Sequence, residues 1–219
     1  MAGGCVVLVP VLNRPHRAAP LVDSVRRTSD ARVLFLCTPG DDEEQEACRA
    51  TGADVIVTDE PLRPGDYARK INAGYRQTRE PLLFLAADDL EFHAGWLEAA
   101  IACLDGTVQV VGTNDLGNAR VMAGEHSTHT LVTRSYVDRF GTIDQPGEVL
   151  HEGYPHEFVD DEFVATAKKR GVWAFAADSH VEHLHPNWGK APMDALYAEQ
   201  GARMRQGQRV FQKRQRLWT

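Results

Sequence analysis

Three clusters of polar side chains in this chain could do chemistry. Two adjacent carboxylates, Asp88 and Asp89, end the apolar run PLLFLA (81–86), an acidic group opens the stretch VDDEFVATAKKRG (159–171), and three histidines follow at 180, 183 and 185. A carboxylate and an imidazole can together bind a manganese or magnesium ion, which in turn binds the phosphates of a nucleotide. A carboxylate at the tip of a buried strand needs a cation or hydrogen-bond donors. We therefore expect a metal site near Asp89.

Each cluster also has a purely structural interpretation. An Asp pair after a strand can cap a helix or form a turn, and acidic residues in a first helical turn favour the helix dipole. Of His183 and His185, we expect at most one to reach a given site easily. The order of the clusters along the chain favours the functional interpretation: a strand-end Asp pair, an acidic helix start, and histidines about twenty residues later.

The elements that must position these clusters alternate between strand and helix. Apolar runs predict strands, and apolar residues at helical spacing predict the helices between them. The strands are expected over 5–12, 32–37, 54–58, 81–86 and 108–112, and the helices over 16–27, 42–52, 67–78 and 93–105. Such alternation predicts an α/β fold, with a mostly parallel central sheet, helices on both faces and ligands at the carboxyl ends of the strands.

The second half of the chain is less regular. Residues 117–141 suggest a hairpin with a short helix, and residues 142–158 have the Gly, Pro and His content of a long functional loop. A helix over 159–171, a strand over 172–177 and a histidine-rich segment over 178–190 are expected next. We predict a catalytic domain over residues 1–193 and a basic amphipathic tail over residues 194–219.

Composition narrows the function classes. Of the 219 residues, 43% are hydrophobic and 25% are charged, the profile of a globular protein, and the formal charge of −7 argues against nucleic acid as a partner. The four cysteines form no CxxC pair, so we expect them to be reduced and structural. The first residues lack a basic segment followed by a long apolar run, from which we expect a cytoplasmic protein.

Several of these motifs together resemble the GT-A glycosyltransferases, particularly family 2. The resemblance covers about residues 5–190. The stretch VVLVPVLNRP is similar to the family's opening strand and turn, YARKINAGYRQT to its Lys/Arg and Asn-x-Gly helix, and FLAADDLEFHAGWLEA to its metal-binding strand end. EFVDDEF resembles the motif whose second acid is the catalytic base, and SHVEHLHP resembles the segment with the metal-binding histidine.

The resemblance implies a role for each matching residue. Asp89 would bind the metal together with His183 or His185, and Asp161 would be the catalytic base. The nucleotide sugar would be bound by Pro10, Asn13, Arg14, Lys70, Asn72 and Asp88. Two positions depart from the family's pattern: Thr38 and Pro39 replace an Asp-rich turn that contacts the base, and Ala87 replaces the first acid of the usual Asp-x-Asp.

The function implied is metal-dependent transfer of a sugar, with manganese or magnesium as cofactor. The donor would be a nucleotide sugar and the acceptor a hydroxyl of a glycan, lipid, protein or small molecule. Asp161 would deprotonate that hydroxyl, and the configuration would invert. The loop over 141–158, with Tyr154 and Trp188, would shape the pocket. The nucleotide, the sugar, the acceptor and the oligomeric state are not indicated.

Two alternatives remain at this point. A nucleotidyltransferase of similar fold would use the same edge of the sheet, although no Gly-rich, Arg-Lys signature follows the first strand. A non-catalytic interaction protein could instead hold zinc between the histidine segment and Glu157 or Glu182. The tail, with Val210, Phe211 and other apolar residues among basic ones, could contact a membrane or pack on the domain.

Overall fold

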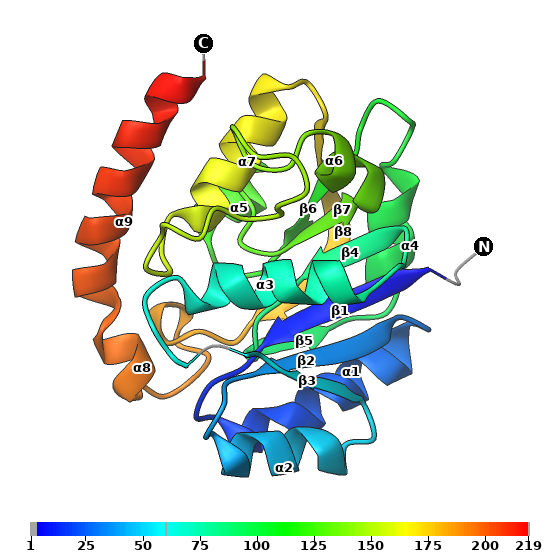
Figure 1. The fold of residues 1–219 in the computed structure, drawn as a ribbon. Coiled ribbons are helices and arrows are strands. Elements are labelled where there is room, and N and C mark those ends of the chain that lie inside the picture. Colours follow the sequence, from blue (N-terminus) through cyan, green and yellow to red (C-terminus); the bar gives the residue numbers. More distant parts are fainter. Residues whose placement is uncertain (1–3, 60, 219) are drawn as a thin grey trace.

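The first half of the chain forms the parallel part of one sheet (Figure 1). The computed structural model describes residues 4–59 and 61–218, so the outer limits of the two predicted segments, 1 and 219, lie outside it. Strands β1 (Cys5–Pro10), β2 (Arg32–Cys37), β3 (Asp54–Val57) and β4 (Leu82–Leu85) pair in parallel, with β1 between β2 and β4. The predicted βαβ alternation is confirmed.

The second half extends this sheet with strands in both directions. Strands β5 (Leu90–Phe92), β6 (Val110–Asn114), β7 (Thr130–Thr133) and β8 (Trp173–His183) complete the order β3-β2-β1-β4-β7-β6-β8-β5. Strand β7 runs antiparallel to both β4 and β6, whereas β8 runs parallel to β6. The first residue of β7 therefore lies at the same edge as the last residues of β4, β6 and β8.

Helices cover both faces of the sheet, as predicted. One face packs on α1 (Ala18–Thr28), α2 (Asp42–Ala50) and α4 (Trp96–Ala102), and the other on α3 (Asp66–Gln77), α6 (Arg134–Arg139) and α7 (Val159–Lys169). Figure 1 shows α3 across one face and α1 and α2 beyond the other. In β1, Val7 and Val9 belong to the first core and Val6 and Leu8 to the second, because successive strand residues point to opposite faces.

Helix α3 packs closely on the sheet at Gly74. A Cβ atom there would lie 2.9 Å from Leu8 Cδ2 and 3.1 Å from Leu36 Cδ1, closer than carbon atoms pack. The glycine in KINAGYRQ therefore sets the distance between α3 and the ends of β1 and β2. The same helix carries Lys70 toward those ends and Asn72 toward the loop at Leu150.

Two sequence predictions need correction. The hairpin expected within 117–141 is absent: the segment forms α5 (Ala119–Met122), β7 and α6, and β7 pairs with β4 and β6 instead. The last strand is longer than 172–177, because pairing with β6 and then β5 continues to His183, so His180 and His183 lie on a strand. The long loop is confirmed, since residues 140–158 contain no helix and no strand.

After η2 (Pro186–Trp188), the tail folds as α8 (Ala195–Ala198), α9 (Gln200–Arg214) and η3 (Gln215–Leu217), and α9 packs beside α7 (Figure 1). Its aromatic side chains face the protein: Phe211 lies 5.8 Å from the Phe158 ring, and Trp218 Nε1 donates to Thr166 Oγ1. These two aromatic side chains are thus used for packing, whereas Leu217 stays 48% exposed. None of the helices within the described residues is long and apolar enough to cross a bilayer.

Arg214 anchors this helix through a buried ion pair. Its Nε and Nη2 donate to Glu162 of α7 at 2.7 and 3.1 Å, and Nη2 also donates to Asp144 at 2.7 Å. Tyr154 Oη donates to the same Glu162 carboxylate at 2.8 Å. Glu162 and Tyr154 therefore bind partners inside the protein, and neither is accessible to a ligand. The prediction that Tyr154 shapes the ligand pocket needs correction.

We expect Arg214→Ala to destabilise the protein by about 3 to 5 kcal/mol, because it leaves the Glu162 carboxylate buried without its cation. Urea unfolding of the two proteins measures this difference. The neighbouring exposed Lys213→Ala is the control and should change stability by less than about 0.5 kcal/mol. Equal stabilities of the two variants would contradict the assignment.

Candidate active site

The polar clusters meet at one edge of the sheet. Asp88 and Asp89 follow β4, Asp115 follows β6, His129 precedes β7, and His183 ends β8. Because β7 runs antiparallel to β4 and β6, its amino end lies beside their carboxyl ends. The site lies where an open α/β sheet binds its ligands.

Asp89, His129 and His183 form the centre of the site. One ligand atom from each lies within 4.8 Å of the other two. His183 Nε2 is 3.2 Å from Asp89 Oδ2, and the two imidazole rings meet edge to face with centroids 5.0 Å apart. All three residues are buried, with 9% or less of their surface exposed.

Several polar atoms of this cluster lack a partner. Asp89 Oδ1, His183 Nδ1 and both ring nitrogens of His129 are buried and have no hydrogen bond of normal geometry within the described residues. A buried polar atom without a partner is costly, and a divalent cation bound by one carboxylate and two imidazoles would satisfy these atoms. The residues present therefore fit a metal ion.

The protonation states also suit a cation. Burial, together with the neighbouring His183, lowers the pKa of His129 to about 3, so its imidazole is neutral and keeps a lone pair. Burial alone would lower the pKa of His183, but the charge and hydrogen bond of Asp89 outweigh it and raise that pKa. Burial likewise opposes ionisation of Asp89, yet His183 and Tyr197 bring its pKa below the usual range. A bound cation would replace the proton on His183.

Two arginines lie beside the acidic pair. The turn after β1 leads into η1 (Pro15–Arg17), and this places Arg14 and Arg17 at the site. Arg14 Nη1 and Arg17 Nη1 lie 3.1 and 3.4 Å from Asp88 Oδ1, and Arg17 Nη1 lies 3.5 Å from Asp89 Oδ2. Burial and the Asp89 charge raise the pKa of Asp88 to about 7 despite these arginines. The pair of guanidinium groups can bind an anion such as a diphosphate.

The other residues predicted to bind the nucleotide sugar lie in different surroundings. Pro10 ends β1, and Asn13, exposed and at φ 53°, donates its backbone N–H to Asp41. Lys70 is buried, and its ammonium contacts Val11 O, Thr38 Oγ1 and Asp66 Oδ2 at 2.6 to 2.7 Å.

Asn72 is also buried. It accepts from the N–H groups of Val149 and Leu150 and donates to the Leu150 carbonyl. Both residues use their hydrogen bonds to hold the loops around the site, and the nucleotide contacts expected of Lys70 and Asn72 stay predictions.

The two histidines of the metal prediction have different positions. His183 belongs to the central cluster, whereas His185 Nδ1 accepts from the backbone N–H of Asn187, and its ring packs 4.5 Å from the Tyr197 ring. The two rings nevertheless lie on the same side of the chain, with centroids 5.0 Å apart, since alternate residues of an extended chain share a face. Hydrogen bonding, not orientation, separates them.

A second acidic cluster adjoins the first. Asp160 and Asp161 occupy the first turn of α7, where His126 Nε2 lies 3.2 Å from Asp160 Oδ2 and Arg120 Nη2 lies 3.3 Å from Asp161 Oδ1. Burial and the Asp160 charge raise the pKa of Asp161, whereas for Asp160 the effect of burial is outweighed by the His126 hydrogen bond, which lowers its pKa. Asp161 is thus the more basic of the two, and its side chain is 20% exposed.

Sequence reasoning missed several side chains at this edge. His126 and His129 stand in the short stretch EHSTH before β7, a spacing that could have indicated a ligand pair, although only the antiparallel course of β7 carries them to the site. Arg17 and Tyr197 carry no motif. The zinc alternative does not assemble, because Glu182 pairs with His93 and Lys190, and Glu157 with Arg203.

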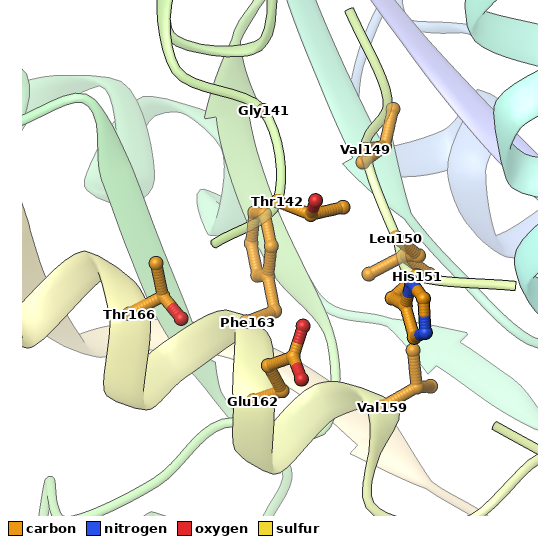
Figure 2. Close-up of a pocket in the computed structure, with 9 residues that line it drawn as sticks. All are labelled: Gly141, Thr142, Val149, Leu150, His151, Val159, Glu162, Phe163 and Thr166. Carbon is orange, nitrogen blue, oxygen red and sulfur yellow. The ribbon is translucent and has the colours of Figure 1, made fainter. Parts of the chain in front are cut away.

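A separate small pocket lies between α7 and the loop after α6 (Figure 2). Its polar groups include His151, Thr142 and Glu162, and Glu162 is already bound by Arg214. The residues of the two acidic clusters do not line it. We therefore place the candidate active site at the sheet edge.

Comparisons with known proteins support this fold. No protein-family model and no curated protein matches the chain. Among solved structures, glucosyl-3-phosphoglycerate synthase from Mycobacterium tuberculosis, crystallised with phosphoglyceric acid, is similar over 97% of this chain and 80% of its own, with a TM-score of 0.67 and 17% identity.

A mannosyltransferase from Pyrobaculum calidifontis, solved with GDP-Man and Mn²⁺, is similar over 91% of this chain and 60% of its own, with a TM-score of 0.66 and 18% identity. At such identities the likeness shows the fold. The GT-A fold predicted from the sequence is confirmed.

We expect the protein to bind Mn²⁺ at the central cluster, and His129→Ala and Asp89→Asn to weaken that binding at least tenfold, roughly the loss seen when support of a metal ligand is removed. Electron paramagnetic resonance of free Mn²⁺ during titration measures the affinity. The matched control is His93→Ala, a half-exposed histidine outside the cluster. Unchanged affinity in His129→Ala would contradict this site.

Proposed function

We propose that this protein is a metal-dependent glycosyltransferase that moves a sugar from a nucleotide-sugar donor to an acceptor hydroxyl. The observation that carries the proposal is the buried cluster of Asp89, His129 and His183, whose unpaired atoms suit a cation and which lies beside two arginines. A cation next to guanidinium groups is the chemistry that binds a diphosphate. The structural neighbours named above, one of them solved with GDP-Man and Mn²⁺, support it.

The metal would be held by Asp89, His129 and His183, and not by His185. When bound, it would supply positive charge that stabilises the departing diphosphate. Two imidazoles in the ligand set favour manganese over magnesium, because Mg²⁺ prefers oxygen ligands. Arg14 and Arg17 would bind the phosphate oxygens and orient the donor, and Asp88 would lie beside the ribose or the metal.

Asp161 is the base in this proposal. Its raised pKa and partial exposure allow it to take a proton from an acceptor hydroxyl, and Arg120 keeps the carboxylate oriented. Asp160 is held by His126, and its charge acts on both His129 and His183, so it would position the central cluster. Glu162, in contrast, is bound by Arg214 and takes no part. A single carboxylate base corresponds to inversion of configuration.

The donor class is the next point to establish. UDP-Glc and GDP-Man, present in structures of the neighbours, are the first donors to test. A nucleotidyltransferase remains the enzymatic alternative, and transfer of a nucleotidyl group in place of a sugar would favour it. A cytoplasmic location and a separate catalytic domain over residues 1–193 stay predictions, and contacts of Asp194 and Tyr197 with the site count against treating the tail as an appendage.

Calorimetric titration with UDP and GDP, each with and without Mn²⁺, tests the donor site. We expect Mn²⁺-dependent binding of one nucleotide and a loss of at least tenfold in affinity in Asp89→Asn, roughly the effect of disturbing a metal site. The control is Asp178→Asn, an exposed carboxylate on β8. Absence of binding by the folded wild type would remove the basis for the proposal.

Steady-state transfer assays of Asp161→Asn and Asp160→Asn test the base. We expect Asp161→Asn to lower kcat about 10²- to 10⁴-fold with nucleotide binding retained. Because burial and Asp160 raise the Asp161 pKa, and the base must be ionised, the wild-type rate should fall with decreasing pH at a value above the ordinary Asp pKa of about 3.9. Exposed Asp23→Asn is the control. A larger kcat loss in Asp160→Asn would transfer the role to Asp160.

A further inference from the structure

Two side chains of the C-terminal segment reach into the candidate active site. Asp194, just before α8, accepts two hydrogen bonds from the Nε–Nη2 edge of the Arg14 guanidinium. Nε donates to Oδ2 at 2.8 Å and Nη2 to Oδ1 at 3.0 Å. This two-pronged contact is the geometry in which arginine also binds a phosphate. A carboxylate of this chain thus occupies one anion position of the site.

Tyr197 occupies a neighbouring position. Its hydroxyl donates to Asp89 Oδ2 at 2.7 Å and accepts from Arg17 Nη1 at 2.8 Å, and its ring lies 4.0 Å beneath the Arg14 guanidinium. Asp89 Oδ2 is the same oxygen that lies 3.2 Å from His183 Nε2. The phenol therefore takes up a lone pair of the carboxylate that would bind the metal.

Besides these contacts, the Tyr197 ring packs 4.5 Å from the His185 ring, and the Leu196 carbonyl accepts from Arg203 Nη2. Helix α8 is a single turn whose one buried residue is Tyr197, and Asp194 accepts from the Tyr197 backbone N–H to begin that turn. Met193 beside it is 62% exposed, and the Asp194 side chain is 36% exposed. Contacts with Arg14, Arg17 and Asp89 therefore supply much of what holds α8 against the sheet edge.

We propose that Asp194 and Tyr197 act as an internal ligand that occupies the diphosphate and metal positions of the site, and that a metal-bound nucleoside diphosphate binds by displacing them. This inference rests on the proposed function, because it takes Arg14 and Arg17 as the diphosphate site and Asp89 as a metal ligand. The Nε–Nη2 edge of Arg14 cannot bind a carboxylate and a phosphate at once. With the site closed, Asp194 and Tyr197 add partners to Arg14, Arg17 and Asp89, whose other partners are Asp88 and His183.

If the segment must open before the ligand binds, the apparent affinity is the intrinsic affinity multiplied by the fraction of molecules in which the segment is open. Variants that keep the fold but weaken the internal ligand should therefore bind more tightly. Asp194→Asn removes the charge and retains a residue that begins a helix well. Tyr197→Phe removes the hydroxyl and retains the ring under Arg14.

The experiment uses the full chain and Mn²⁺ with inorganic pyrophosphate, a diphosphate without a base, measured by titration calorimetry. We expect Asp194→Asn to bind pyrophosphate about tenfold more tightly, the gain if the segment is closed in about nine of ten molecules, and Tyr197→Phe to bind Mn²⁺ more tightly. Exposed Glu199→Gln makes the same charge change at the start of α9, away from Arg14, and should leave pyrophosphate affinity at the wild-type value. Equal or weaker binding in both variants would overturn the proposal.

Hydrogen exchange of residues 190–199 gives a readout that needs no substitution. Displacement predicts faster exchange of these amides when Mn²⁺ and pyrophosphate are added, whereas slower exchange would show that the segment closes over the ligand and would overturn the inference. The two proposals fail differently. If UDP or GDP binds the wild type with Mn²⁺ but Asp194→Asn brings no gain, the donor site stands and the internal ligand does not. If neither the wild type nor Asp194→Asn binds UDP, GDP or pyrophosphate, both are wrong.

Discussion

The buried carboxylate of Asp89 is the constraint around which the sheet edge is organised. An isolated carboxylate cannot stay ionised inside a protein unless positive or donor groups surround it. Here Arg17, His183 and Tyr197 reach one oxygen, and the other has no hydrogen-bond partner among the described residues. With Asp89 itself, these groups come from four distant parts of the chain, so the contacts of one carboxylate connect the end of β4 with β8, η1 and the C-terminal segment. The same unpaired oxygen is what makes the cluster suited to a cation.

The antiparallel course of β7 gives this site its composition. A wholly parallel sheet would bring only strand ends to the ligand-binding edge. Reversing one strand brings a strand start there as well, and with it the EHSTH segment: His129 joins the central cluster and His126 holds Asp160. The predicted metal-binding strand end has Ala87 two residues before Asp89, and the two imidazoles of His129 and His183 complete the cluster around that single carboxylate.

A second layer of buried polar groups keeps the loops in place. Lys70 joins the ends of β1 and β2 through Val11 and Thr38, and Asn72 holds the backbone at Leu150. Such groups hydrogen-bond to backbone that has no partner in a helix or strand, and so they give irregular segments one conformation. Helix α3 therefore contributes to the site through the loops that Lys70 and Asn72 hold in place.

The sequence by itself determined the α/β fold and the strands and helices of the first half, and it singled out Asp89, Asp161 and His183, which lie in the two polar clusters of the sheet edge, because these follow from local periodicity and from motifs contiguous in the chain. Only the tertiary structure decided which side chains meet. The direction of β7, the extension of β8 and the docking of the C-terminal helix all depend on pairing between segments far apart in sequence. Arg17 and Tyr197 therefore joined the site without any signal in their neighbours, since long-range packing leaves no periodic trace in the residues it brings together.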